Sequence, residues 1–297
     1  GNTAPVPPSQ KTDPLSHYQP IPVKSLKPLP RKRRRWGWWL VALVLVYFLA
    51  PLRTNLLVLG TDRTEGTNIG RSDTILLLSI VPLQPYVSML SIPRDLWVNI
   101  PGVGEDRINT AHFYAEASQP GSGPDATLET IRANFGVRVS RYVTINFDGF
   151  VELIDAVGGV DIELVQAEGG LPAGTHHLDA GQALAFVRER YSSDDFYRMR
   201  HGQMVVQAAA GKMANPANWW RWPGIVSALS RAVKTNVPFY DWPRLGLALL
   251  RAALTNTIDS HVIDRDYVTP YTTGQGANIL LPNWDAIHPL VVELFAP

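Results

Sequence analysis

Three continuous apolar runs stand out along the chain, each bounded by glycine, proline or polar residues. They fall at residues 55–60, 73–81 and 86–92. Runs of this length and bounding predict strands that are covered on both faces. A short strand and a turn are expected within residues 96–104, and further strands at 141–147, 159–164, 262–268 and 278–282.

Amphipathic segments typical of helices lie between and after these strands. They span residues 124–135, 148–159, 179–187, 195–214, 223–235 and 241–255. The second of them should be capped by Asp148 and end at Gly158 and Gly159. Strands that alternate with helices predict a layered α/β domain with helices packed on the sheet.

Residues 36–52 form an apolar segment without a charged residue, and Trp36, Trp38 and Trp39 stand at its start. A helix of this length spans about 25 Å, near the lower limit for a bilayer core, and tryptophan suits the headgroup region. We therefore predict one transmembrane helix at 36–52. A cleaved secretory segment is the alternative, but the polar leader is long and no small-residue cleavage motif is visible.

Charge is distributed unevenly around this segment. Residues 1–35 carry eight Lys or Arg against one Asp, whereas residues 53–297 carry nineteen against twenty-five acidic residues. Basic residues beside a span stay in the cytoplasm. The sequence thus predicts a disordered proline-rich cytoplasmic tail at 1–35, a single pass through the cytoplasmic membrane, and an extracytoplasmic domain at 53–297. An acidic domain argues against a nucleic-acid partner.

Charged residues punctuate the apolar runs of the predicted sheet. They form three neighbouring sets: Asp62 with Arg63, Arg71 with Asp73, and Arg94 with Asp95. Arg188 and Arg190 end the helix expected at 179–187, and both can serve one site only if that helix stops near Val187. A single such pair is more often a surface ion pair. Because strand ends in layered α/β sheets are where ligands bind, four such groups favour a binding site.

Arginine dominates the basic residues of the predicted domain. After residue 52 the chain has seventeen arginines and two lysines, and it has no cysteine anywhere. The planar guanidinium binds phosphate oxygens in a bidentate way that lysine cannot, so the bias favours a phosphate-bearing ligand. A genomic preference for arginine codons is the alternative explanation. The lack of cysteine excludes a thiolate nucleophile and a cysteine zinc site.

Six segments follow one another from Asn55 to about Lys212. They read "NLLVLGTD", "GRSDTILLLSI", "VSMLSIPRDLWVNIPGVGEDRINTAHFYA", "INFDGFVELIDAVGGVDIEL", "LDAGQALAFVRER" and "DDFYRMRHGQ". In this order they resemble the signatures of the LytR-CpsA-Psr family of bacterial cell-envelope proteins. A single membrane anchor before the domain is also similar to that family.

The resemblance implies an α-β-α domain with a central mixed sheet, acting as a phosphotransferase outside the cytoplasmic membrane. Such a protein holds a polyprenyl-pyrophosphate-linked glycan with its lipid in an apolar tunnel between sheet and helices. It transfers the glycosyl phosphate to a hydroxyl of peptidoglycan or a related acceptor and releases polyprenyl phosphate. The membrane and these two substrates are therefore its expected partners.

Carried over by motif, Asp62 and Asp73 would hold Mg²⁺, with Mn²⁺ as the alternative ion, against the pyrophosphate. Four arginines would bind the pyrophosphate oxygens: Arg71, Arg94, Arg188 and Arg190. Arg107 would lie nearby, Arg198 would contribute from the following helix, and Asp95 would hold a neighbouring arginine. Oxygen ligands and guanidinium groups suit phosphoryl transfer, which needs charge neutralisation and positioning. The general base stays open among the three aspartates.

The chain departs from the family pattern after "DFYR". His201 and Gly202 stand where arginine and glutamine are expected. Either Arg200 replaces the missing charge from the adjacent position, or the site has one fewer permanent positive charge. Arg200 and Gln203 are therefore counted among the substrate-binding candidates.

Two other functions stay open at this point. A polyprenyl-pyrophosphate pyrophosphatase would use the same residues with water in place of the acceptor hydroxyl. A non-catalytic, membrane-tethered binder of lipid-linked glycans would need the charges but not the chemistry. Metal-dependent release of polyprenyl phosphate separates both enzymes from the binder, and a covalent adduct with the acceptor separates the transferase from the pyrophosphatase.

Overall fold

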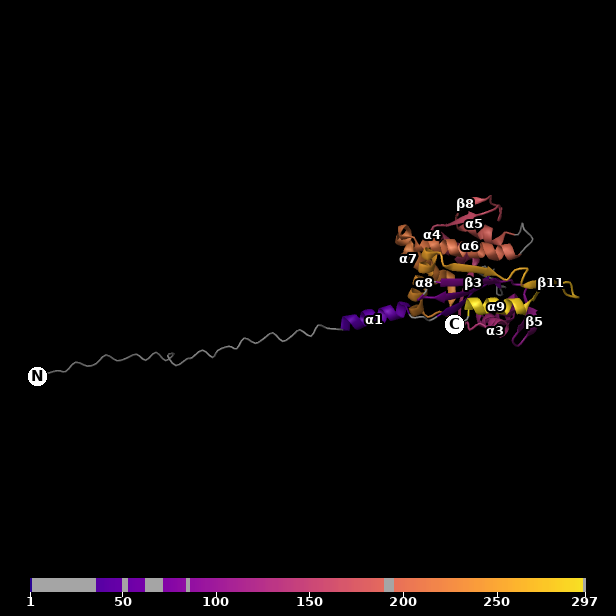
Figure 1. The fold of residues 1–297 in the computed structure, drawn as a ribbon, viewed down its shortest axis with the longest axis horizontal. Coiled ribbons are helices and arrows are strands. Elements are labelled where there is room, and N and C mark those ends of the chain that lie inside the picture. The colour runs from indigo at the N-terminus through magenta and orange to yellow at the C-terminus, as the bar shows by residue number, and fades with distance from the viewer. Residues whose placement is uncertain (2–35, 50–52, 62–71, 84–85, 190–194, 296–297) are drawn as a thin grey trace. The chain divides into compact units, whose positions relative to one another are not determined.

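The computed structural model describes residues 1, 36–49, 53–61, 72–83, 86–189 and 195–295. The chain divides into two units, Gly1–Leu43 and Val44–Pro297, and the second contains the folded domain (Figure 1). A six-stranded sheet with the order β10-β3-β2-β1-β6-β9 forms its centre. The strands are β1 (Thr54–Thr61), β2 (Ser72–Val81), β3 (Tyr86–Ile92), β6 (Arg141–Asn146), β9 (Val233–Thr235) and β10 (Ile258–Val262).

The sheet is mixed, as the resemblance implied. β1, β2 and β3 form an antiparallel meander. β6 runs parallel to β1 and β10 parallel to β3, whereas β9 closes the far edge antiparallel to β6. The amino-terminal half of the domain thus builds the middle of the sheet, and later segments add both edges.

Helices cover both faces of this sheet, which gives the expected α-β-α layers. Leu57 and Leu59 of β1 pack with α2 (Ile108–Ser118), α3 (Gly123–Phe135) and α9 (Trp284–Phe295) in one core. Leu56, on the opposite side of the same strand, packs with α8 (Trp242–Thr255) in another. The alternation follows from the period of two along a strand. Figure 1 shows α3 and α9 on one side of β3 and α6 (Asp195–Ala214) on the other.

A separate core lies outside the sheet. The hairpin of β7 (Val160–Leu164) and β8 (Gly174–Leu178) packs with α4 (Phe147–Val157), α5 (Ala180–Arg188) and α6. The cap of α4 is Asn146, whose side chain accepts a hydrogen bond from the Gly149 N–H. The prediction of Asp148 as cap was therefore wrong, because Asp148 lies in the first turn of the helix. Gly158 ends α4 in the left-handed conformation, as predicted.

Short elements complete the domain. They are β4 (Trp97–Ile100), β5 (Gly104–Arg107), β11 (Val268–Thr272), β12 (Asn278–Pro282), α7 (Trp222–Ala232) and the 3-10 helices η1 (Pro216–Arg221) and η2 (Phe239–Asp241). The helix predicted at 223–235 stops at Ala232, and its last residues pair with β6 as β9.

The strand predicted at 262–268 was also wrong. The segment is a turn between β10 and β11, in which the Asp266 and Tyr267 N–H groups donate to the side chain and carbonyl of Asp264. Aspartate favours such a turn because its carboxylate accepts a hydrogen bond from the backbone two residues on.

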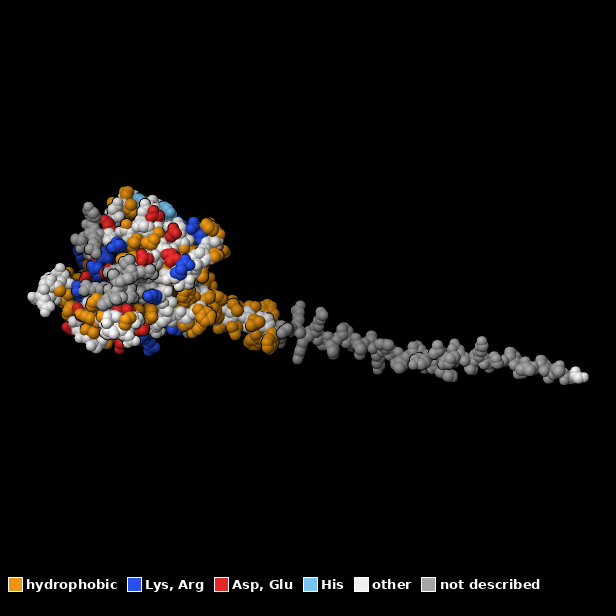
Figure 2. Space-filling model, turned by 180° about the vertical axis from the view of Figure 1, so that it is seen from behind, with side chains coloured by type: hydrophobic (Ala, Val, Ile, Leu, Met, Phe, Trp, Pro, Cys, Tyr) orange, Lys and Arg blue, Asp and Glu red, His pale blue; other side chains and the backbone are white. Residues whose placement is uncertain are grey.

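The apolar segment before the domain is helical at α1 (Trp36–Leu49). Its large apolar side chains are exposed along the helix, and they colour its visible side orange in Figure 2. Across the described parts of the chain, no helix combines the length and the apolar character needed to cross a bilayer.

Candidate functional site

The turn after β3 places two charged residues at the end of a buried strand. Pro93 ends the strand, and the Leu96 N–H donates to its carbonyl at 3.1 Å to close the turn. The carbonyl of Arg94 accepts from the Asn109 N–H at 3.2 Å, and that of Asp95 accepts from the Leu280 N–H at 3.0 Å. Backbone bonds from α2 and β12 therefore fix the direction in which both side chains leave the sheet.

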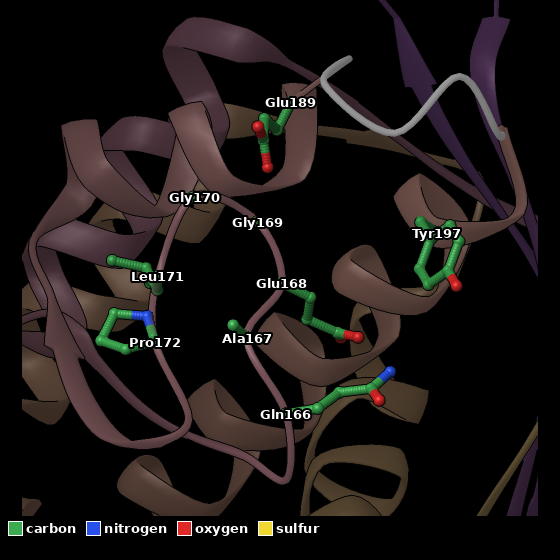
Figure 3. A pocket seen from close by; sticks show the side chains of 9 residues that line it. All are labelled: Gln166, Ala167, Glu168, Gly169, Gly170, Leu171, Pro172, Glu189 and Tyr197. Carbon is green, nitrogen blue, oxygen red and sulfur yellow. The ribbon is translucent and has the colours of Figure 1, made fainter.

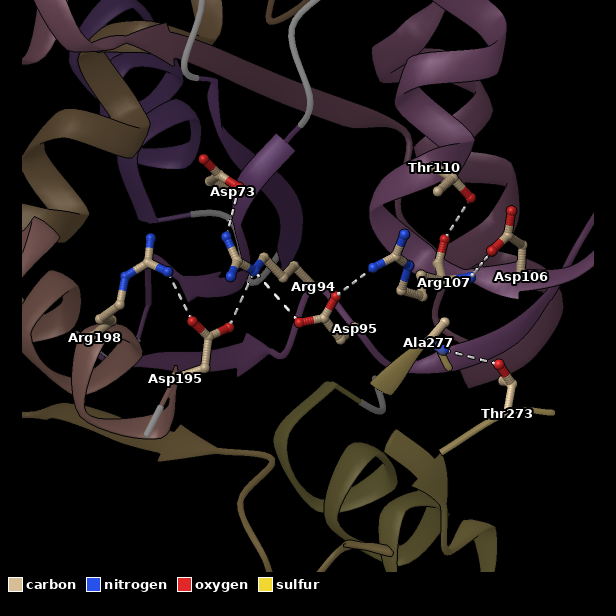
Figure 4. Close-up of polar contacts among 10 residues, drawn as sticks. All are labelled: Asp73, Arg94, Asp95, Asp106, Arg107, Thr110, Asp195, Arg198, Thr273 and Ala277. Carbon is tan, nitrogen blue, oxygen red and sulfur yellow. Dashed lines mark hydrogen bonds and ion pairs between the residues drawn. The ribbon is translucent and has the colours of Figure 1, made fainter. Parts of the chain in front are cut away.

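Arg94 is the centre of a network of charges (Figure 4). Its guanidinium lies 3.0 Å from Asp73, 3.4 Å from Asp195 and 3.5 Å from Asp95. Burial by itself lowers the pKa of Arg94, but these three carboxylates raise the pKa by more, so the net shift is upward. The guanidinium is therefore permanently charged and held from three sides.

Two more arginines extend the network. Arg198 contacts Asp195 at 2.7 Å, and Arg107 contacts Asp95 at 3.4 Å. We call the six residues Asp73, Arg94, Asp95, Arg107, Asp195 and Arg198 the arginine–aspartate network. Their side chains are between 17% and 31% exposed, so each is partly shielded yet reachable from solvent. Four parts of the chain meet here: the start of β2, the turn after β3, the end of β5 and the start of α6.

A cavity of 430 Å³ opens beside the network. It is lined by Asp73 and Arg198 of the network, by Phe147, and by one face of α5. That face consists of Gly181, Leu184, Ala185 and Arg188, which recur at helical spacing. Arg188 lies over the Phe147 ring at 4.7 Å. The cavity, termed the arginine cavity below, thus combines apolar lining residues with two guanidinium groups and a carboxylate.

Residues 51–280 match the LytR_cpsA_psr family. The chain belongs to the LytR-CpsA-Psr family. The protein named polyisoprenyl-teichoic acid–peptidoglycan teichoic acid transferase TagU of Oceanobacillus iheyensis is 34% identical over 254 residues, which cover 70% of this chain and 79% of the relative. The TagU of Bacillus cereus is 33% identical over 190 residues, which are 62% of this chain and 60% of the relative.

Solved structures show the same fold. The crystal structure of Bacillus subtilis TagV superposes with a TM-score of 0.66 at 25% identity, covering 82% of this chain and 98% of TagV. A structure described as TagT bound to LIIa-WTA gives a TM-score of 0.65 at 24% identity, covering 82% of this chain and 89% of TagT. The mixed sheet with helices on both faces is therefore the fold of the LytR-CpsA-Psr family.

The structure brings five predicted site residues of this family member together. Asp73, Arg94, Asp95, Arg107 and Arg198 belong to one network. Arg188 shares the arginine cavity with two of them. α5 ends at Arg188, close to Val187, where the helix was expected to stop if Arg188 and Arg190 serve one site. Three other predicted residues, Asp62, Arg71 and Arg190, lie outside the described residues.

Asp195 is a site residue that the sequence did not single out. From the start of α6 it joins Arg94, in the turn after β3, to Arg198 of its own helix. Its spacing of three residues from Arg198 was a usable signal, because side chains at i and i+3 of a helix face each other. Its contact with Arg94 had no local signal.

Arg200 and Gln203 lie apart from the network. The Arg200 guanidinium stacks over Tyr197 at 5.2 Å and lines a different cavity of 520 Å³. Gln203 is buried, and its amide donates to Ser91 Oγ at 2.9 Å and to the His261 carbonyl at 2.7 Å. The replacement of a missing charge by Arg200 stays a prediction, as does substrate binding by Gln203.

His201 occupies an interior position rather than the arginine cavity. The ring is 2% exposed, stacks on Phe186 at 4.1 Å, and lies 3.4 Å from Glu168 through Nε2. Burial lowers the pKa of His201, and Glu168 only partly offsets this by raising it. The residue in place of the expected arginine therefore packs with α5 and the loop before β8.

The side chains near the network determine whether the predicted Mg²⁺ could be held there. Asp73 is a carboxylate, the ligand type that Mg²⁺ prefers, and it lines the arginine cavity. One of its oxygens already accepts a hydrogen bond from Arg94 at 3.0 Å. Within the described ranges no three acidic or histidine side chains are grouped as metal ligands. Asp73 fits the donor type, and the metal site stays a prediction because Asp62 is not described.

Proposed function

We propose that the protein transfers a glycopolymer phosphate from a polyprenyl-pyrophosphate carrier to a hydroxyl of peptidoglycan or a related envelope acceptor. Membership in the LytR-CpsA-Psr family and the names of the TagU relatives support this proposal. The observation that carries it is the arginine cavity, where Arg188 and Arg198 meet Asp73 beside an apolar wall. A phosphate attached to a lipid has both an anionic group for the arginines and an apolar part for the wall.

Arg188 differs from the arginines of the network in its partners. Arg94, Arg107 and Arg198 each contact at least one carboxylate. Among the residues that the structure describes, no carboxylate lies within ion-pair distance of Arg188, whose contact is the Phe147 ring. Its charge is therefore available for phosphate oxygens, and guanidinium groups bind these through two parallel hydrogen bonds.

The proposed reaction makes one bond and breaks one. The acceptor oxygen forms a bond to the phosphorus that carries the sugar. The bond from this phosphorus to the bridging oxygen breaks, and polyprenyl phosphate leaves with that oxygen. Arg188 and Arg198 would stabilise the charge that develops on the phosphate oxygens, an effect that typically contributes about 3–4 kcal/mol for one well-placed donor.

The aspartates would divide the remaining roles. Asp95 contacts Arg94 through one oxygen and Arg107 through the other, so we assign it the positioning of both arginines. Asp73 lines the cavity and, with Asp62, is the proposed holder of Mg²⁺. When bound, Mg²⁺ would neutralise charge on the pyrophosphate. Asp73 and Asp62 also remain the candidates for accepting the proton of the acceptor hydroxyl.

We further propose that residues 36–52 anchor the domain in the cytoplasmic membrane, with the tail at 1–35 in the cytoplasm. The uncharged apolar segment and the basic leader support this arrangement. Protease added outside intact cells should then degrade residues 53–297 and leave the tail. Protection of the domain would contradict the orientation.

The proposed activity can be tested with the full chain in detergent and a synthetic polyprenyl-pyrophosphate glycan. We expect Mg²⁺-dependent release of polyprenyl phosphate, and a covalent adduct when peptidoglycan fragments are added. Arg188→Ala should abolish both, whereas Arg231→Ala, which changes an exposed arginine of α7, should not. Tight binding without cleavage would support the glycan binder instead. Cleavage without an adduct for any acceptor would support the pyrophosphatase.

A further inference from the structure

A further and larger cavity adjoins the end of α5 and the start of α6. Its volume is 770 Å³, within the range of about 300–1,000 Å³ that is typical of ligand sites. Residues 166–172, between β7 and β8, form most of its wall, and Glu189 and Tyr197 complete it (Figure 3). We call it the loop cavity.

The loop cavity and the arginine cavity are lined by neighbouring residues of the same two segments. Arg188 lines the arginine cavity and the next residue, Glu189, lines the loop cavity. On α6 the same division falls between Arg198 and Tyr197. Consecutive Cα atoms are about 3.8 Å apart, so the two cavities adjoin each other at the end of α5 and the start of α6.

The two cavities differ in charge. The described lining of the loop cavity includes two carboxylates, Glu168 and Glu189, and no arginine or lysine. Gln166, Tyr197 and the apolar side chains of Leu171 and Pro172 make up most of the rest. Carboxylates repel phosphate and accept hydrogen bonds from hydroxyl and amide N–H groups. The ligand class that fits is uncharged and rich in hydrogen-bond donors.

The wall of the loop cavity is held in place by its own backbone. The N–H of Glu168 donates to the Leu171 carbonyl at 3.0 Å, and the N–H of Leu171 donates to the Glu168 carbonyl at 3.1 Å. Gly169 between them has a φ of +63°, and a Cβ there would come within 2.2 Å of the Phe186 ring. The loop is thus pressed against α5 and presents a fixed surface.

His201 is buried next to Glu168 of this wall, and its Nε2 atom has no hydrogen-bond partner among the described residues. Nδ1 of His201 lies 3.1 Å from the Phe186 carbonyl, which can only accept, so Nδ1 carries the proton and Nε2 of the neutral ring is an acceptor. Nε2 points at Glu168 Oε1 at 3.4 Å, another acceptor, and it has no hydrogen-bond partner among the described residues. Glu168 Oε1 therefore receives no hydrogen bond from the neutral ring, and its acceptor capacity is open to a donor in the loop cavity.

From these observations we infer that the loop cavity binds an uncharged sugar residue of the acceptor glycan, next to the one whose hydroxyl reacts. The inference rests on the proposed function, since the acceptor is defined by that function. Tyr197 offers an aromatic face to the sugar ring. Glu168 and Glu189 accept its hydroxyl and amide donors. The anionic donor stays on the arginine side.

The experiment measures binding of a tetrasaccharide of N-acetylglucosamine to the full chain by calorimetry. Glu168→Gln keeps the shape but can donate to His201 Nε2 internally, so we expect at least about a tenfold loss of affinity, because hydrogen bonds to charged groups are the stronger ones. Tyr197→Ala should weaken binding similarly and Tyr197→Phe much less. The matched control is Glu163→Gln, which changes an exposed glutamate on β7 of the same hairpin. Circular dichroism and thermal unfolding verify that each variant is folded.

Inorganic pyrophosphate serves as the anionic probe. It should not displace the tetrasaccharide, and Arg188→Ala should weaken pyrophosphate far more than the sugar. If Glu168→Gln and Tyr197→Ala bind the tetrasaccharide like the control, or if pyrophosphate displaces it, the inference is overturned.

The transfer assay keeps this test distinct from that of the proposed function. In a working transferase, Glu168→Gln should lower the ratio of covalent adduct to hydrolysed sugar phosphate by about the same factor as it lowers sugar affinity. An unchanged ratio overturns the inference while the transferase function stands. If the unchanged protein forms no adduct, the transferase function is overturned. The calorimetric measurement of tetrasaccharide binding still tests the sugar site in that case.

Discussion

Asp195→Asn tests whether the arginine–aspartate network is a working unit. The carboxylate lies 3.4 Å from Arg94 and 2.7 Å from Arg198, and it is in the first turn of α6. The amide of asparagine keeps the shape but removes the charge that holds both guanidinium groups. We therefore expect a loss of stability and a larger loss of activity.

The magnitude follows from the exposure of the three side chains. Asp195 is 28% exposed, Arg94 26% and Arg198 17%. Partly exposed ion pairs contribute about 0.5–1 kcal/mol each, and a carboxylate in the first turn of a helix contributes about 0.3–1 kcal/mol. The free energy of unfolding should fall by about 2 kcal/mol, which lowers Tm by roughly 4–8 °C for a domain of this size. Displacement of a positioned group by about 1 Å can cost about a hundredfold in rate, so kcat should fall between ten- and a hundredfold.

The assay compares thermal unfolding and polyprenyl phosphate release for Asp195→Asn, Asp195→Glu and the control Asp155→Asn. Asp155 is an exposed aspartate on α4. Glutamate should restore part of the rate, because it returns the charge at a slightly different distance, and partial rescue separates positioning from mere stability. If Asp195→Asn matches Asp155→Asn in Tm and kcat, Asp195 does not position the arginines and the network is only a surface feature.

Three further predictions follow from single side chains. Arg188→Ala and Arg188→Lys should both lower turnover by at least about a hundredfold with unchanged Tm, since the guanidinium fork is lost from an exposed position; normal turnover of the lysine variant would refute a bidentate role. Gln203→Leu should lower the free energy of unfolding by about 1–3 kcal/mol, because buried Ser91 loses its partner, and urea unfolding measures this. Burial and the carboxylate of Asp259 raise the pKa of Tyr86 from 10.0 to about 12. A raised folded-state pKa means that the folded protein favours the neutral phenol, so the stability of the unchanged protein should fall as the pH rises from 10 to 12. Tyr86→Phe should lack this part of the fall, and Tm measured against pH tests it.

The strands of the central sheet could be predicted because their buried positions coincide with apolar runs in the local sequence. β2 is buried at six consecutive positions, and its sequence is a continuous apolar run. The helix α2 could not be predicted, since Asn109, Thr110, His112 and Glu116 are polar residues on its buried face. Glu116 accepts hydrogen bonds from the Gly121 and Gly123 N–H groups, so its burial depends on contacts outside the helix. The apolar pattern alone does not contain that information.

The helix α9 could not be predicted either, because it contains a proline. α9 contains Pro289 in its interior, a residue that predicts the end of a helix. The helix persists because Ile287, Leu290, Val291, Leu294 and Phe295 are buried in the core of the sheet. Packing of one apolar face outweighs the local cost of one missing backbone hydrogen bond.

The candidate site was predictable where residues belong to a single motif. Arg94 and Asp95 are neighbours in sequence, and their contact at 3.5 Å needs only the turn after Pro93. The contact between Arg94 and Asp195 spans about a hundred residues and depends on how α6 packs across β3. His201 shows the limit of motif transfer, because the same helical position faces Glu168 and Phe186 once arginine is absent.

The balance of charge in the site constrains the order in which groups engage a phosphate. The network contains three arginines and three aspartates, so it has no net charge to offer before a substrate arrives. Any phosphate bound by Arg94 must compete with three carboxylates that already hold it. Arg188 has no such competition among the described residues, and it lines the cavity together with apolar residues of α5. The first contact with an anionic donor should therefore form at Arg188, and the network should act afterwards as a rigid frame that holds Arg198 and Asp73 in place.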